Sequence, residues 1–91
     1  MLFLIISNPH PSKPEESKTV RLEFRHWIKA LETEKKVLYA FPRVCRGYAA
    51  VFDVVGNEEL HEFLTKWSNI IPVSFDIYPL VSPETSERLL R

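Results

Sequence analysis

The sequence is poor in residues and patterns that define several classes of protein. Cys45 is its one cysteine among 91 residues, so no disulfide can form within the chain, and no Cys and His spacing matches a structural zinc site. A lone cysteine is commonly a small buried hydrophobe and becomes a nucleophile only beside a base. We therefore expect no metal site and a location in the reducing cytoplasm.

An excess of charge of one sign is also missing. Twelve Lys and Arg residues balance twelve Asp and Glu residues, so no long-range field attracts nucleic acid or an anionic membrane. The basic and aromatic strand signature of an RNA-recognition sheet is absent as well. The apolar run Leu2–Ile6 is too short for a membrane helix and has neither a basic leader nor a cleavage site. We expect no nucleic-acid partner and no membrane partner, and we interpret the run as a buried strand.

The chain does have enough apolar residues for a core. Hydrophobic residues make up 45% of it, which at this length predicts a single domain over residues 1–91. Residues 82–91 form a polar C-terminal tail that could add one short helix.

Two segments have the periodicity of amphipathic helices. The first begins at about Ser12, where Ser12 and Glu15 suit a capping box, and runs to about Glu34. The second has Asn57 as its expected N-cap and ends near Ser68. Each helix carries one apolar stripe, made of Val20, Phe24, Trp27, Ile28 and Leu31 in the first and of Leu60, Phe63, Leu64 and Trp67 in the second.

Four segments are typical of strands. They are Leu2–Ile6, 37–41 (stopped by Pro42), 45–54 and 73–80. The order βαββαβ predicts an α+β, ferredoxin-like sandwich, in which two helices cover one face of a four-stranded antiparallel sheet.

The second face of this sheet would be left exposed by the two helices. Both alternating sets of side chains are apolar on the first strand, and both lean apolar on the third. A bare apolar face of several hundred Å² would be an association surface. We expect a homodimer or a higher homo-oligomer that pairs sheet to sheet as a dimeric α/β barrel.

The second half of the chain carries an ordered series of short motifs: Arg43, Tyr48-Ala49, Phe52-Asp53-Val54, Glu59-Leu60-His61, Asp76-Ile77 and Pro79-Leu80. In order and spacing this series resembles the muconolactone isomerases. The resemblance implies a cofactor-free ferredoxin-like protein, active in aromatic-compound breakdown, that moves a proton between two carbons of an unsaturated lactone. The resemblance implies a small-molecule partner, an anionic lactone.

The resemblance also implies site residues. Arg43 occupies the family's Arg position and would clamp the substrate carboxylate, while Tyr48 would donate a hydrogen bond to the enolate oxygen. Further substrate-binding candidates are Tyr39, Asp76 and Tyr78.

Three positions depart from the family pattern. Gly47, Leu4 and Ala40 stand where relatives tend to carry residues able to transfer a proton. Arg46 or Glu23 could substitute as catalytic groups, and Glu23 can border the sheet from the first helix.

Plain structural roles compete with these functional ones. Arg43 could make a surface ion pair, Tyr48 could be an ordinary sheet aromatic, and Asp76 and Tyr78 could be polar groups of an edge strand at water. Two hypotheses for the protein follow. It is either a cofactor-independent isomerase, or a non-catalytic protein of the same fold that binds small molecules or serves in assembly.

Overall fold

A computed structural model describes residues 1–11, 14–44 and 46–90, with the side chains of these residues except 14–17. The elements follow in the order β1 (Leu2–Pro9), α1 (Pro14–Thr33), β2 (Val37–Pro42), β3 (Tyr48–Asp53), α2 (Asn57–Ile70), β4 (Val73–Leu80) and α3 (Pro83–Leu89). The α+β class and the βαββαβ order are confirmed, with α3 added in the C-terminal tail.

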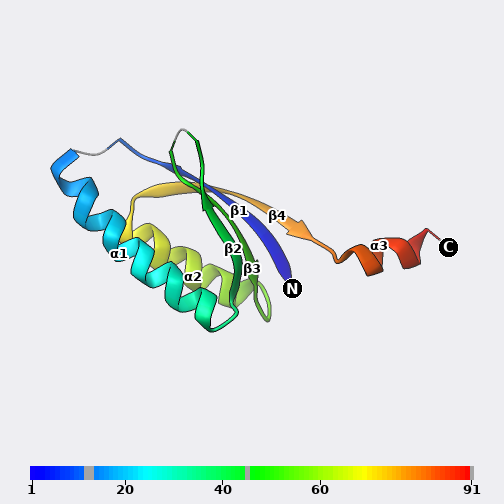
Figure 1. Ribbon diagram of the computed structural model, residues 1–91. Coiled ribbons are helices and arrows are strands. Elements are labelled where there is room, and N and C mark those ends of the chain that lie inside the picture. The colour runs from blue at the N-terminus through cyan, green and yellow to red at the C-terminus, as the bar shows by residue number, and fades with distance from the viewer. Residues whose placement is uncertain (12–13, 45, 91) are drawn as a thin grey trace.

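The four strands form one antiparallel sheet in the order β2-β3-β1-β4. Helices α1 and α2 lie side by side against one face of this sheet, and the opposite face is bare (Figure 1). This is the ferredoxin-like arrangement that the sequence predicts.

The core lies between the helices and the sheet. Trp67 is 1% exposed, and its ring centroid lies 4.8 Å from that of Phe24, so the two helices meet through aromatic rings over the sheet. The buried hydrophobic residues are Phe3, Ile5, Phe24, Ile28, Leu31, Val37, Ala50, Phe52, Val54, Leu60, Leu64 and Trp67. The predicted stripes of both helices are therefore confirmed, with Trp27 and Phe63 packed at their margins, except at Val20, which is half-buried and lies outside this core.

Four strand boundaries differ from the sequence-based prediction, and two of them by a single residue, since β2 includes Pro42 and β3 ends at Asp53. Strand β1 continues to Pro9 instead of ending at Ile6, because it keeps pairing with β4 as far as Val73. Strand β3 begins only at Tyr48, because the Arg43 N–H donates to the Gly47 oxygen at 2.8 Å and closes a loop before it. The expected strand start at Cys45 and the Ser12–Glu15 capping box lie outside the described residues.

The start of α2 is also shifted. Gly56, not Asn57, is the N-cap, and no side chain caps the helix there. Instead the Glu59 carboxylate accepts the Val55 N–H at 3.0 Å and pairs with Lys36 at 3.2 Å. The Val55 N–H lowers the pKa of Glu59, partial desolvation opposes this, and Lys36 adds to the lowering. The helix ends at Ile70, two residues beyond the predicted end.

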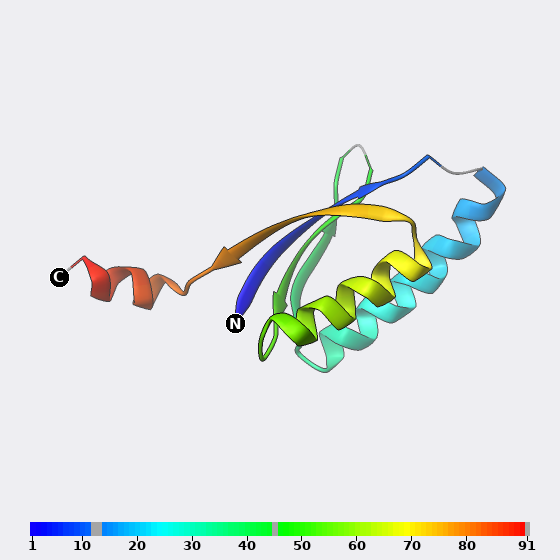
Figure 2. The same cartoon turned by 180° about the vertical axis from the view of Figure 1, so that it is seen from behind.

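The bare face of the sheet has a central row without charged side chains. Tyr39, Val51, Leu4 and Tyr78 are in register across all four strands, and the two tyrosines at the ends of this row are 62% and 51% exposed. We call this surface the outer face. Helix α3 projects beyond the sheet at the end of β4 and leaves the outer face open (Figures 1 and 2). No described helix is long and apolar enough to cross a membrane.

We predict that two copies pair through the outer face. In light scattering after size exclusion, the native chain should have about twice its 10.7 kDa mass. Tyr78→Glu should shift the protein towards the monomer, because pairing would desolvate a carboxylate against an apolar surface.

Val44→Glu is the matched control, since Val44 is fully exposed in the loop between β2 and β3. It should leave the mass unchanged. A native chain that stays monomeric at high concentration would contradict sheet-to-sheet pairing.

Candidate functional site

A cavity of about 790 Å³ opens between the helices and the inner face of the sheet. It lies where β1 ends, α1 begins, α2 ends and the loop joining β2 to β3 turns back. We call it the inner cavity. Its size is within the range of small-molecule sites, and it is lined by both apolar and cationic side chains.

The floor of the inner cavity is held to the central strand through Ser7. The Tyr48 N–H donates to the Ser7 hydroxyl at 2.8 Å, which satisfies a side chain that is only 1% exposed. Gly47 precedes it with φ of +88°, and a Cβ there would collide with the Ser7 carbonyl oxygen. The backbone therefore needs glycine at this position, both for its conformation and for its closeness to β1.

Aromatic rings form the inner wall. The Tyr48 ring centroid lies 4.9 Å from that of Phe24, and Phe24 in turn stacks at a tilt on Trp67. All three side chains line the cavity. A flat unsaturated molecule would meet ring surfaces on this wall.

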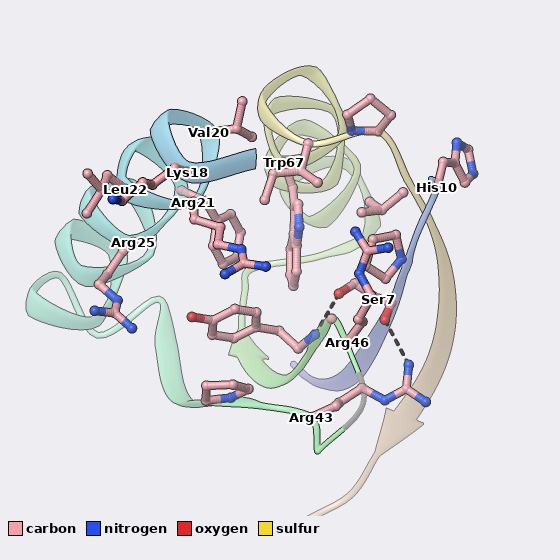
Figure 3. Close-up of a pocket in the computed structure, with 18 of the residues that line it drawn as sticks. Ser7, His10, Lys18, Val20, Arg21, Leu22, Arg25, Arg43, Arg46 and Trp67 are labelled. Carbon is pink, nitrogen blue, oxygen red and sulfur yellow. Dashed lines mark hydrogen bonds between the residues drawn. The ribbon is translucent and has the colours of Figure 1, made fainter. Parts of the chain in front are cut away.

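Cationic side chains surround the opening. Lys18, Arg21 and Arg25 come from α1, and Arg43 and Arg46 from the loop between β2 and β3. Figure 3 shows the two groups on opposite sides, with the Arg21 guanidinium directed into the space between them. Among the described residues that line the cavity, none is Asp or Glu. The site therefore favours an anion.

Arg43 also has a structural role at the rim. Its guanidinium donates to the Ser7 oxygen at 2.9 Å and to the Asn8 Oδ1 at 2.8 Å. Asn8 donates in turn to the Asp76 carboxylate at 3.1 Å. Part of the hydrogen-bonding capacity of Arg43 is thus used to fasten the loop after β2 to β1, and Arg46 carries no such described contact.

The structure divides the predicted site residues into two groups. Arg43, Arg46 and Tyr48 line the inner cavity. Tyr39 and Tyr78 lie on the outer face, and Asp76 lies there too, opposite Ile6, joined to Arg43 only through Asn8. These two groups do not converge on one cleft within a single chain.

Glu23, the remaining candidate, is exposed on α1 and is not among the lining residues. The cations of α1 and the buried Ser7 were not predicted as site residues. The spacing of Lys18, Arg21 and Arg25 by three and four was the available signal, because it places them on one side of a helix. Within the described residues no group of three or more His, Cys, Asp or Glu side chains could hold a metal ion.

The family described as "Domain of unknown function (DUF3303)" matches residues 1–91. The chain belongs to this family. No curated protein matches it.

Several solved structures share the fold. One is 5-chloro-2-hydroxyhydroquinone dehydrochlorinase (TftG) from Burkholderia phenoliruptrix AC1100, in complex with 2,5-dihydroxybenzoquinone, with a TM-score of 0.71 and 13% identity over 93% of this chain and 98% of that chain. Another is a muconolactone isomerase, with a TM-score of 0.67 and 20% identity over 91% of this chain and 92% of that chain. At these identities the likeness establishes the fold, which agrees with the resemblance seen in the sequence motifs.

We predict that Gly47→Ala destabilises the protein by about 2–3 kcal/mol, because the new methyl group would collide with β1 in a strained backbone conformation. Chemical denaturation followed by circular dichroism measures this loss. Gly56→Ala is the control, since nothing lies within 4 Å of a Cβ at that position, and it should cost less than about 1 kcal/mol. Equal losses in the two variants would contradict the tight contact between Gly47 and Ser7.

Proposed function

We propose that the inner cavity binds a small, planar, unsaturated anion, such as a lactone or an aromatic ring that carries a carboxylate. The observation that carries this proposal is the combination of an aromatic wall with five cations and no described acid. An arginine fork matches a carboxylate with two parallel hydrogen bonds, while the rings take the apolar part of the ligand.

Arg46 is the first candidate for the carboxylate clamp. It is exposed at the loop between β2 and β3, close in sequence to Tyr48, which forms part of the aromatic wall. Arg43 stands beside it as a second cation, although Ser7 and Asn8 already occupy part of its guanidinium. A ligand held there would have its ring against Tyr48 and Phe24.

Benzoate is a suitable probe of this binding. In two-dimensional NMR of ¹⁵N-labelled protein, it should move the backbone signals of Gly47 and Tyr48 and the indole signal of Trp67. Arg46→Gln should weaken benzoate binding about tenfold, because the charged fork is lost.

The matched control is Arg88→Gln, which removes the same charge from the exposed helix α3. It should leave the affinity for benzoate unchanged. Shifts confined to Tyr39 and Tyr78 would place binding on the outer face and contradict the proposal.

A second candidate function is a cofactor-independent isomerase of aromatic-compound breakdown. The position of Tyr48 in the inner cavity and the fold shared with a muconolactone isomerase favour it. Its reaction would need a base to remove a proton from carbon, and the dienolate would then be stabilised by Tyr48 and Arg46. His10 lines the cavity, but its ring points away from the other labelled side chains (Figure 3). Glu23 is not among the lining residues. The cavity could therefore hold the substrate, but no described base is well placed to remove its proton.

We therefore expect muconolactone turnover, followed by absorbance at high protein concentration, to be at least about a thousandfold slower than that of a working isomerase, since a positioned base contributes a factor of that order. Fast turnover that is lost in Tyr48→Phe would make the isomerase, and not anion binding alone, the leading function. Tyr39→Phe, on the outer face, is the control for loss of a hydroxyl away from the cavity.

A further inference from the structure

The inner cavity has positive charge on two separate walls. On α1, Lys18, Arg21 and Arg25 are spaced by three and four residues, so they follow one side of the helix along the cavity. On the other wall, Arg43 and Arg46 belong to the loop between β2 and β3. Figure 3 shows these walls facing each other across the aromatic side chains.

A ligand with a single carboxylate would use only one of these walls. One arginine fork, at Arg46, suffices to hold a carboxylate, and the cations of α1 would then face the cavity without a counter-charge from the ligand. Like charges gathered at one opening repel one another, so a second anionic group at α1 would relieve this repulsion as well as form new hydrogen bonds.

The positive charge of the inner cavity is local. The formal net charge of the chain is zero, and four described acids, Asp53, Glu58, Glu59 and Glu62, lie around the start of α2 at the other end of the sheet. Glu23 on α1 and Asp76 on β4 do not line the cavity. The cations that line it therefore attract an anion at short range, and a dianion more strongly than a monoanion.

We propose that the ligand of the inner cavity is a planar dianion whose anionic groups stand at opposite ends of an unsaturated or aromatic framework. Arg46 holds one group and Arg21 holds the other, while Phe24 and Tyr48 contact the framework between them. The proposal rests on the function proposed above and makes Arg21 the residue that determines specificity. A cavity of about 790 Å³ accommodates a ring with two such substituents.

Two probes that differ in one substituent test the proposal. Terephthalate and 4-methylbenzoate share the ring and one carboxylate, but the second has a methyl group where the first has its other carboxylate. By isothermal titration calorimetry at low ionic strength, terephthalate should bind about tenfold more tightly to the native protein. Arg21→Gln should weaken terephthalate binding about five- to tenfold and change 4-methylbenzoate binding by less than about twofold.

Lys29→Gln is the matched control, because it removes one positive charge from an exposed position of α1 that does not line the cavity. It should preserve the preference for terephthalate. Glutamine suits an exposed helical position, so Arg21→Gln should keep the native circular dichroism spectrum.

The outcomes separate the two proposals. Equal affinity for both probes would overturn the dianion inference and leave anion binding intact. Failure of both probes to bind would overturn the proposed function and this inference together. Equal weakening of terephthalate binding by Arg21→Gln and Lys29→Gln would also overturn the dianion inference. The loss of affinity would then come from weaker long-range attraction and not from a lost contact at Arg21.

Discussion

The contact between the loop after β2 and the central strand at Ser7 is the constraint on which the inner cavity depends. Tyr48 donates its N–H to the buried Ser7 hydroxyl, Arg43 donates to the Ser7 carbonyl oxygen, and Gly47 lies tightly against the same oxygen. These contacts hold the loop over the end of β1. They bring the Tyr48 ring onto Phe24 and keep Arg46 at the opening, so the floor, the wall and the charge of the cavity share one anchor.

The same contact limits the chemistry of the site. At Gly47, where the resemblance led us to expect a residue able to transfer a proton, any side chain would collide with β1. This position therefore cannot supply a proton-transferring side chain unless the backbone of the loop changes as well. Cations from α1 and from the loop define the opening instead. An arrangement of this kind binds and orients an anion more readily than it removes a proton from carbon.

Much of the fold follows from local patterns in the sequence, because periodicity identifies buried stripes and the order of elements restricts the topology. The predicted end of β1 was wrong. Ser7-Asn8-Pro9 has a turn-forming composition, but pairing with β4 keeps these residues extended. Arg43, Arg46 and Tyr48 could be grouped from their closeness in sequence. The cations of α1 could not be assigned to the same site from the sequence, because their approach to the loop depends on how the helix packs across the sheet. Tyr39 and Tyr78 face away because strand register decides the face of each side chain.

The fold itself does not choose the chemistry. One structure with this fold is a dehydrochlorinase and another is a muconolactone isomerase, so the fold alone does not determine the reaction. In this chain the side chains around the inner cavity are cations on two walls and aromatic rings between them. The central row of the outer face has no charged side chain by contrast, and a chain of hydrogen bonds from Arg43 through Asn8 to Asp76 connects the two surfaces. The proposed association and the proposed ligand binding thus involve opposite faces of one sheet, and a change on one face can be tested with the other left intact.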